Sequence, residues 1–367
     1  MRIAFVSDSY IPVPTGVAVS IETLRRVLKG LGHSVVVFAP DYPGWSVKEE
    51  GVVRLPALFS PFNSTIPARW PAFGINSKKI RSLKIDIVHS HYFFRPFPLA
   101  QDIASASACP LIHSFYRIFD RDVTIKYVKS CTGIIALSKA SKKILQEMNV
   151  PAKIHTLPVG IFTKDYASYP PQAVRKRFRI PEERQLLLYP ARLDDEAEFM
   201  FLLKSFKKIW QAQDDVHLLV VGGGEKLKYY YELAGKQPFG KYITFTGFLP
   251  KKRLNKIYGA CDLTIYPKKN DPEPLVLLES MAAGTPVVCV KGMGAQDLMV
   301  DHQTGFVTPA KVDQFAEAVI DLLRRDTLRF KFSQHCRQHA KRFSASILTR
   351  DLLDFYEQEL LSENHKF

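Results

Sequence analysis

Short apolar runs alternate with amphipathic segments along the whole 367-residue chain. Two apolar runs, 2–7 and 34–39, flank a segment at 17–31 whose apolar side chains recur every three or four positions, which predicts strand, helix and strand. The same reasoning predicts further strands in this half at 86–89, 110–113, 133–137 and 153–157. Such alternation is typical of a parallel sheet with helices on both faces.

The alternation starts afresh after a Pro-rich, basic stretch at 169–184, which is the best candidate for a linker. Strands are then predicted at 186–189, 216–221, 242–246, 262–266 and 286–290. Three helical segments follow, and the last, 346–362, is long enough to return to the first half. One hydrophobic core rarely organises a chain of this length.

These patterns predict an α/β protein with two doubly wound, Rossmann-like domains that face each other across a cleft. The first domain is expected at residues 1–168 and the second at 169–342. Residues 343–367 are expected to form a C-terminal helix that crosses back to the first domain. Ligands of such open sheets bind beyond the carboxyl ends of the strands, so the residues that follow each strand are the first candidates for a site.

The composition is that of an ordinary globular protein, with 46% hydrophobic and 24% charged residues. No apolar run reaches the length of about 18 residues that spans a membrane, and the opening MRIAFVSDSY is a first strand rather than a signal peptide. The five cysteines are widely spaced, with no pair suited to a zinc site. We therefore expect a cytoplasmic protein whose cysteines are reduced.

The net charge of +15 is concentrated in the first half, where residues 1–170 contain 21 Lys and Arg against 11 Asp and Glu. Within it, the segment 55–84 places four aromatic residues just before four cations: Phe59, Phe62, Trp70, Phe73, then Lys78, Lys79, Arg81 and Lys84. Apolar anchors beside cations suit an anionic bilayer interface. The alternative is a Pro-rich loop whose aromatic side chains fold back onto the domain, and both interpretations stay open.

Several kinds of site are excluded. No G-x-G-x-x-G follows the first strand, and no P-loop, G-x-S-x-G elbow, H-E-x-x-H or paired-cysteine metal motif occurs. His89 and His91 follow a strand and point the same way, which permits a metal, but no third ligand is evident. A structural or substrate-contacting role is the better interpretation of these two histidines.

Three positions after predicted strands indicate a phosphorylated ligand. Gly16 opens a helix, where free N–H groups and the helix dipole can receive a phosphate. Arg192 follows the strand in LLLYPAR and has the planar fork of a bidentate phosphate clamp. The loop 246–248 could bring its backbone to a flat base. The structural alternatives are a tight turn, a surface arginine and a plain β-turn.

The segment DPEPLVLLESMAAGTPVVCV, residues 271–290, combines a loop, a helix of small residues and a strand with two carboxylates, Asp271 and Glu279. A carboxylate accepts paired hydrogen bonds from vicinal hydroxyls, so such residues recognise sugars and riboses. The alternative is an amphipathic helix that carries surface acids.

The order of these pieces resembles the retaining, nucleotide-sugar-dependent glycosyltransferases of the GT-B fold. That large family includes sucrose and glycogen synthases, phosphatidylinositol mannosyltransferases and bacterial diacylglycerol glucosyltransferases. The resemblance covers nearly the whole chain, through DSYIPVPTGVAVSIETLRRVLKGLGHSVVVFAP, DIVHSHYFF, YPARL, VVGGGE, ITFTGFLP, CDLTIYP, LVLLESMAAGTPVV and DHQTGFVTP. The opening, with Gly-Val where many members have Gly-Gly, is most similar to the diacylglycerol-acting branch.

The resemblance implies that Glu279 holds the ribose hydroxyls, Asp271 the transferred sugar, and Arg192 and Gly16 the diphosphate. It implies a catalytic group of Asp271, Arg192, Tyr116 and His113. It implies a donor-binding group of Gly16, Val17, Arg192, Gly247, Phe248, Leu275, Val276 and Glu279. It also implies no metal and no cofactor, because the nucleotide-diphosphate sugar is a co-substrate whose leaving phosphate helps to deliver the acceptor.

Four positions depart from the pattern of the family. Asp271 stands where relatives usually carry glutamate, and Ala197 where a second phosphate-binding lysine is expected. Pro274 replaces a glycine whose N–H would face the donor, and proline has no N–H to donate. Tyr116 occupies the place of an expected histidine, with His113 three residues earlier.

Two hypotheses follow. The first is a retaining glycosyltransferase that moves a hexose to a lipid acceptor, such as diacylglycerol or a phospholipid. It would act at the cytoplasmic membrane face, held peripherally through the basic first domain and without a nucleic-acid partner. The second is a sugar-nucleotide-binding or scaffold protein that kept the fold and lost turnover. An enzyme with a soluble acceptor and a sugar-nucleotide epimerase are the remaining alternatives.

Overall fold

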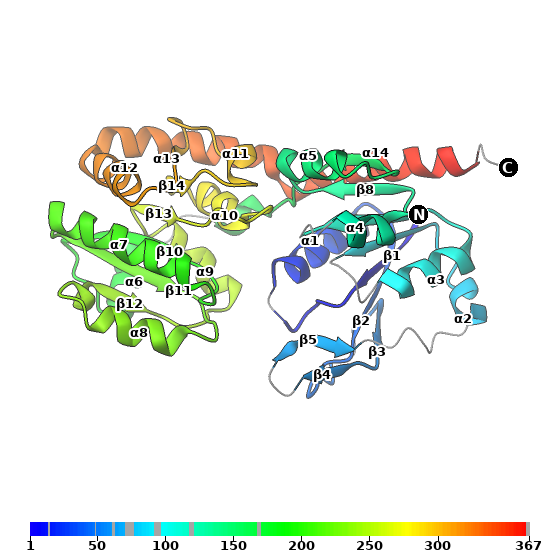
Figure 1. Cartoon of the computed structure of the whole chain (residues 1–367). Coiled ribbons are helices and arrows are strands. Elements are labelled where there is room, and N and C mark those ends of the chain that lie inside the picture. The colour runs from blue at the N-terminus through cyan, green and yellow to red at the C-terminus, as the bar shows by residue number, and fades with distance from the viewer. Residues whose placement is uncertain are drawn as a thin grey trace. The chain divides into compact units, whose positions relative to one another are not determined.

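The computed structural model describes residues 1–13, 15–47, 49–60, 63–69, 77–91, 97–116, 121–166 and 170–364. The chain forms two compact units, Met1–Gly160 with Ala345–Phe367, and Ile161–Ser344 (Figure 1). The sequence placed the domain boundaries at 168/169 and 342/343. The short helix η1 (Thr163–Tyr166) shows why residues 161–166 go with the second unit, because its Tyr166 is buried and donates a hydrogen bond to Glu279.

The first unit is built on a seven-stranded sheet in the order β3-β2-β1-β6-β7-β8-β9. All its pairings are parallel. The strands are β1 (Arg2–Ser7), β2 (Ser34–Pro40), β3 (Val52–Leu55), β6 (Ile87–His91), β7 (Leu111–Phe115), β8 (Gly133–Ala136) and β9 (Lys153–Thr156). The helices are α1 (Gly16–Gly30), α2 (Ser77–Ser82), α3 (Phe97–Ser107), α4 (Arg121–Val128), α5 (Lys139–Glu147) and α14 (Ala345–Asn364).

The second unit has a six-stranded parallel sheet in the order β12-β11-β10-β13-β14-β15. Its strands are β10 (Gln185–Pro190), β11 (Val216–Val221), β12 (Ile243–Phe245), β13 (Leu263–Tyr266), β14 (Val287–Val290) and β15 (Gly305–Thr308). One face packs on α7 (Glu196–Ala212), α8 (Leu227–Gly235) and α12 (Val312–Arg324). The other packs on α6 (Pro171–Phe178), α9 (Lys251–Tyr258), α10 (Leu275–Ala283) and the end of α13 (Asp326–Ala340). The prediction of two doubly wound parallel sheets is confirmed.

Two interpretations of the pattern were wrong. The stretch 169–184 is not a linker, because it contains α6, whose Val174 is buried in the core of the second unit. Pro171 begins α6. The first N–H groups of a helix have no partner within the helix, so a proline, which lacks an N–H, is well tolerated there. The strand β15 was missed, since it begins at Gly305 with φ +146°. A Cβ on Gly305 would lie 1.7 Å from Val287 O, so only glycine lets β15 pair beside β14.

The aromatic and basic stretch of the first unit contains a hairpin of β4 (Leu58–Ser60) and β5 (Asn63–Arg69), followed by α2. The ring of Phe59 packs on that of Tyr42, with centroids 5.3 Å apart. Phe62, Trp70 and Phe73 lie outside the described residues. The open choice between a bilayer anchor and a folded-back loop is therefore settled only for Phe59, which packs onto its own unit.

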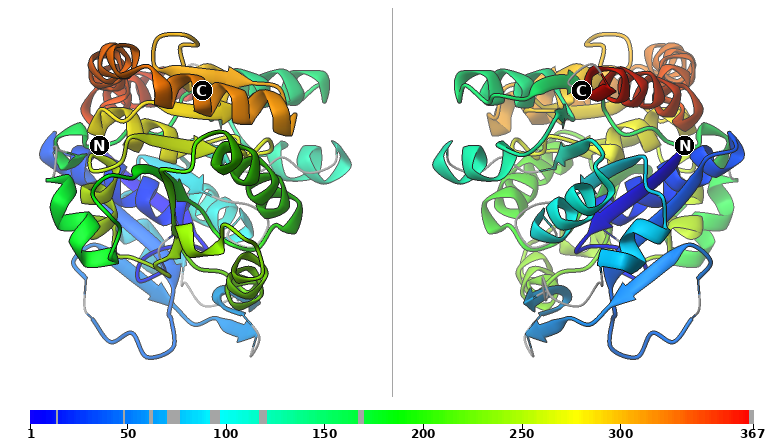
Figure 2. Two further views of the ribbon diagram at one scale, coloured as in Figure 1. Left: turned by 90° about the vertical axis from the view of Figure 1, so that its left-hand side faces the viewer. Right: turned by 90° about the vertical axis from the view of Figure 1, so that its right-hand side faces the viewer.

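The C-terminal helix α14, red in the right-hand view of Figure 2, packs against α1, so the predicted return to the first domain is confirmed. The Tyr356 hydroxyl lies 2.6 Å from His89 Nδ1 on β6. The ring of Phe355 stacks on His155 of β9 with centroids 4.9 Å apart. Polar and aromatic contacts thus attach this helix to two strands of the first sheet.

Three buried histidines lie in the first unit. His89 and His91 point the same way from β6, with ring centroids 4.0 Å apart, while His113 packs between Phe97 and Phe115. Burial holds the pKa of His89 below its usual range and lowers the pKa of His91 and His113 to about 3. Within the described ranges no cluster of His, Cys, Asp and Glu side chains is suited to a metal ion. All three histidines are therefore uncharged side chains of the core at neutral pH.

Replacing Tyr356 by Phe should lower the free energy of unfolding by about 1–3 kcal/mol, because it leaves a buried imidazole nitrogen of His89 without its partner. Urea denaturation of the whole chain measures the change. The matched control is Tyr231→Phe on α8, whose side chain is 63% exposed. Equal losses in the two variants would contradict the role assigned to the Tyr356 hydroxyl.

The buried histidines should make the protein acid-sensitive. Below their ordinary pKa of 6.5 the unfolded chain binds protons that the folded chain excludes, so the free energy of unfolding falls as the pH drops from 6.5 towards 3. At about pH 5 each such histidine costs about 2 kcal/mol. His113→Phe should therefore flatten the pH dependence measured by denaturation between about pH 7 and pH 5. An unchanged slope would show that His113 does not take part in this acid sensitivity.

Candidate active site

The loops that follow β10, β11, β12 and β13 meet at one edge of the second sheet, because carboxyl ends of parallel strands share an edge. These loops carry Arg192, the glycines 222–224, Gly247 and Asp271. The predicted donor residues of this unit therefore lie in loops after strands, except for those on α10. Glu279, Leu275 and Val276 lie on α10 itself.

Gly222 and Gly224, the first and third of three consecutive glycines, allow close packing of these loops. The Gly222 N–H donates to Gly247 O at 3.1 Å, and Gly222 has φ +144°. A Cβ there would lie 1.9 Å from Ala191 O, and one on Gly224 would lie 2.4 Å from Asp194 Oδ1. The glycines thus let the loop after β11 rest on the loop that carries Arg192.

Arg192 is held by a neighbouring carboxylate. Its Nε and Nη2 atoms lie 2.8 and 2.7 Å from Asp194 Oδ2, while Asp194 Oδ1 accepts from the Glu225 N–H at 3.0 Å. Burial alone would raise the pKa of Asp194, but the hydrogen bonds from Arg192 and Glu225 lower it below its usual value. The Arg192 side chain is 65% exposed, and exposed pairs contribute about 0–1 kcal/mol, so a phosphate can replace Asp194 as its partner.

The acidic residues around Ala197 have structural partners. Asp195 caps α7 by accepting from the Glu198 N–H at 3.1 Å, and Glu196 pairs with Lys226 at 2.9 Å. Glu198 accepts from the Tyr189 hydroxyl at 2.6 Å. The start of α7 therefore contains acids that stabilise the helix and its neighbours, and Ala197 is exposed in its first turn.

Sequence reasoning missed a cation in this region, Lys268. It follows β13, and its Nζ atom lies 3.8 Å from Asp271 Oδ2. Its charge also acts on Asp194 and on Glu198, which places it among three carboxylates. The available signal was a lysine two residues after the end of a strand that leads into the site.

Asp271 is fixed at its place in the loop. It accepts from the Tyr266 hydroxyl at 2.6 Å and from the Glu273 N–H at 3.0 Å. Burial, followed by the charge of Asp271, raises the pKa of Tyr266, so its hydroxyl remains a donor. The Asp271 side chain is 23% exposed, which leaves the carboxylate accessible from the solvent side.

Pro274 is the N-cap residue of α10 and lacks an N–H. The Leu275 N–H donates to Glu273 O at 2.8 Å, and the Leu277 N–H to Pro274 O at 3.0 Å. Of the donors in this first turn, the Val276 N–H has no acceptor in the part of the chain that the structure describes. Leu275 and Val276 are themselves half-buried, and the Val276 N–H is thus the donor that α10 offers to a ligand.

Glu279 is buried, with its side chain 8% exposed, and three donors surround its carboxylate. Oε1 accepts from the Tyr166 hydroxyl and from Lys251 Nζ, both at 2.9 Å, and Oε2 accepts from the Tyr258 hydroxyl at 2.7 Å. A carboxylate accepts about four hydrogen bonds, so one position remains for a ligand. Burial, then the charge of Glu279, raises the pKa of both tyrosines and keeps their hydroxyls protonated.

No sequence signal pointed to Tyr166, Lys251 or Tyr258, which come from η1 and α9. The remaining predicted residues of this unit are Gly247, with φ +68°, and Phe248, whose side chain is 60% exposed. An exposed aromatic ring beside a glycine turn can stack on a flat base. Lys268 links Asp194 to Asp271 electrostatically, while Glu279 contacts a separate set of side chains.

In the first unit, the predicted Gly16 and Val17 begin α1. Thr15 is the N-cap and accepts from the Ala18 N–H at 3.1 Å, and its hydroxyl lies 2.5 Å from Ser9 Oγ. The Val17 side chain is buried, so only its backbone N–H is available to a ligand. Gly16 has open space around its Cα.

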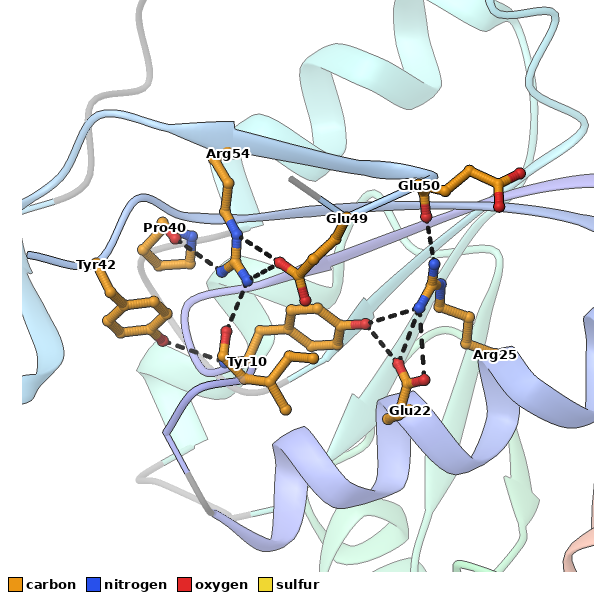
Figure 3. Close-up of polar contacts among 9 residues, drawn as sticks. Tyr10, Glu22, Arg25, Pro40, Tyr42, Glu49, Glu50 and Arg54 are labelled. Atoms are coloured by element: carbon orange, nitrogen blue, oxygen red, sulfur yellow. Dashed lines mark hydrogen bonds and ion pairs between the residues drawn. The ribbon is translucent and has the colours of Figure 1, made fainter. Parts of the chain in front are cut away.

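The loop before α1 is held by the network in Figure 3. Arg54 donates to Ile11 O at 2.7 Å and to Pro40 O at 3.1 Å, and it also pairs with Glu49. The Tyr10 hydroxyl donates to Glu22 Oε2 at 2.6 Å. These contacts fix Tyr10 and Ile11 in the loop that precedes α1.

Tyr116 and His113 lie on opposite faces of the first sheet. The Tyr116 hydroxyl lies 3.2 Å from His91 Nδ1, and Tyr116 lines a cavity of about 20 Å³ with His89 and Ser114. His113 is 1% exposed among aromatic rings. The structure therefore does not bring these two predicted catalytic residues together.

Every helix in the described part of the chain is too short or too polar to span a bilayer.

Two family models match the chain, one for glycosyltransferase family 4 over residues 14–165 and one for glycosyl transferases group 1 over residues 172–343.

Among the curated relatives, alpha-monoglucosyldiacylglycerol synthase of Streptococcus pneumoniae is 25% identical over 88% of this chain and 78% of that protein. Phosphatidyl-myo-inositol mannosyltransferase of Mycolicibacterium smegmatis is 26% identical over 97% and 94%. Among solved structures, Anabaena Alr3699/HepE, in complex with UDP and glucose, has a TM-score of 0.80 at 16% identity, over 98% of this chain and 100% of that one. The loops after the parallel strands, the two matching models and the shared architecture lead to one conclusion: the chain belongs to the group 1 glycosyltransferases of family 4 and has the GT-B fold.

Proposed function

We propose that this glycosyltransferase transfers a hexose, with retention of configuration, from a nucleotide-diphosphate sugar to a lipid acceptor at the cytoplasmic face of a membrane. The observation that carries the donor half of the proposal is the edge of the second sheet where Arg192, Lys268 and Asp271 gather. The relatives named as lipid glycosyltransferases support the acceptor half.

In the proposed donor site, separate groups bind the ribose, the base and the transferred sugar. Glu279 accepts hydrogen bonds from the ribose hydroxyls. One acceptor position of its carboxylate is open, and a second would open if the half-exposed Lys251 side chain moved away. The base lies against Phe248 and the Gly247 backbone. Asp271 accepts from hydroxyls of the transferred sugar, as a fixed carboxylate can.

The diphosphate is proposed to lie between Arg192, Lys268 and the Val276 N–H of the second unit. In the first unit, the N–H groups of Gly16 and Val17 stay candidate phosphate donors. Departure of a nucleoside diphosphate builds negative charge, and fixed cations and N–H groups aimed at that charge stabilise the transition state. Lys268 then supplies the positive charge that Ala197 lacks. Tyr116 stays a candidate catalytic residue, whereas the burial of His113 suits a packing role.

A peripheral position on the membrane suits the surface of the first unit. Lys78, Arg81 and Lys84 are exposed on and after α2, and Leu58 of the hairpin is 65% exposed. Exposed cations and an exposed apolar side chain on the same unit fit an anionic bilayer surface, where a lipid acceptor would be met.

Purified protein incubated with a panel of nucleotide sugars should release nucleotide diphosphate only when vesicles containing diacylglycerol or phosphatidylinositol are present. Release with a soluble acceptor alone would contradict the lipid assignment. Stabilisation of the fold by a nucleotide, without release from any donor, would instead support the alternative of a binding or scaffold protein.

In the same assay Glu279→Gln should remove the thermal stabilisation by nucleotide, because a neutral amide accepts hydroxyl bonds more weakly than a carboxylate. Glutamine is preferable to alanine here, since alanine would leave two buried tyrosine hydroxyls without their acceptor. A full stabilisation by nucleotide in Glu279→Gln would show that the ribose binds elsewhere.

Lys268→Gln should lower kcat by about a hundredfold if this lysine stabilises the leaving diphosphate. The matched control is Lys269→Gln, since the adjacent lysine is exposed and has the same charge. Introducing Ala197→Lys into the Lys268→Gln variant should restore part of the rate by returning a cation to the first turn of α7. Equal rates in the two single variants would refute the role of Lys268.

A further inference from the structure

The second unit contains a groove on the face of its sheet that packs on α6 and α9. The groove has a volume of about 290 Å³ and is lined by residues of these two helices together with Leu249. Its floor is apolar, with Val174 and Phe178 from α6 and Ile257 from α9. Its rim carries three cations, Arg177, Arg253 and Lys256. None of the residues that line it is acidic.

The two helices are unusually basic. Neither α6, PQAVRKRF, nor α9, KKRLNKIY, contains an acidic residue. Exposed cations lie on both helices or directly after them: Lys176, Arg177, Arg179, Lys252, Arg253 and Lys256. Among the residues that the structure describes, no carboxylate is within ion-pair distance of Arg177 or Arg253. Residues 1–170 contain most of the excess positive charge of the sequence, whereas these two basic helices lie after them, in the second unit.

The groove is separate from the proposed donor site, although α9 borders both. Lys251 and Tyr258 point to Glu279 from one side of α9. Arg253, Lys256 and Ile257 recur at a spacing of three and four and line the groove on another side. The cations of the groove are therefore directed away from the ribose carboxylate.

We propose that this groove binds the headgroup of an anionic phospholipid and so docks the second unit on a membrane surface. The phosphate would lie on Arg177 and Arg253, and the glycerol and the first methylenes of the acyl chains on Val174, Phe178 and Leu249. Charge complementarity favours this occupant, because a cationic rim around an apolar floor matches an anionic head on an apolar stem. A nucleic acid would need aromatic platforms for its bases, and the floor provides one ring, Phe178.

Binding to vesicles, measured by co-sedimentation without any nucleotide sugar, tests the proposal independently of transferase activity. The wild-type chain should bind vesicles of phosphatidylcholine with phosphatidylglycerol more tightly than vesicles of phosphatidylcholine alone. The double variant Arg177→Glu/Arg253→Glu should lower the partition coefficient on the anionic vesicles by at least about tenfold.

The matched control is Lys204→Glu/Lys207→Glu, which changes the net charge by the same amount at exposed positions of α7, on the opposite face of the second sheet. This control should lose less than about threefold. Equal losses in the two double variants would overturn the proposal, because only the overall charge would then matter. Thermal melting of each variant confirms that the fold is intact.

The apolar floor has its own test. Leu249→Gln leaves the charge unchanged and should weaken binding most at high salt, where the attraction of the headgroup is screened. Binding that Leu249→Gln leaves unchanged at every salt concentration would reduce the groove to a general basic surface and overturn the proposal. Loss of self-association in the groove variant, with vesicle binding retained, would overturn it as well and assign the groove to a second copy of the chain.

Discussion

The buried carboxylate of Glu279 is the contact on which the second unit depends. It joins η1, where the chain enters the unit, to both ends of α9, through Tyr166, Lys251 and Tyr258. A buried carboxylate without donors would be very costly, whereas three donors make it a stable junction. The same group is the proposed ribose site, so by that proposal one side chain would serve both binding and architecture. The contact of Tyr166 with this carboxylate explains why residues 161–166 belong to the second unit, ahead of the first strand of its sheet.

Much of this organisation could be predicted from the sequence, because strands and the residues after them are local features. The spans expected for β1 and β11 agree with the observed strands, and Arg192 and Asp271 lie after strands as expected. The partners of these residues could not be predicted. Tyr166 and Glu279 are 113 positions apart, and no local pattern encodes a contact over that distance. The helix α6 was missed because prolines and cations are typical of linkers, and only the structure shows that Val174 packs in the core.

The departures from the family pattern have different physical weights. At Ala197, the acids nearby have partners of their own, and Lys268 provides a cation among the carboxylates, so the local charge is less unfavourable than the sequence indicated. Pro274 is a more definite loss, because proline has no N–H to donate at the N-cap of α10. The Val276 N–H, two residues on, is what remains for a ligand at the start of α10. Compared with the family pattern, the proposed donor site therefore has an additional lysine near Asp271 and lacks one backbone donor.

The helix α9 connects these conclusions, because its two sides serve different surfaces. Lys251, at its first position, pairs with Glu279, while Arg253 and Lys256 line the basic groove. Lys251 precedes Arg253 by two positions and Lys256 by five on this short helix. Since Lys251 occupies one of the four acceptor positions of Glu279, its place decides how many are open to a ribose. If both proposals hold, membrane docking and donor binding use residues of the same eight-residue helix, and any coupling between them would appear equally in the affinity for the nucleotide and in the affinity for the vesicle.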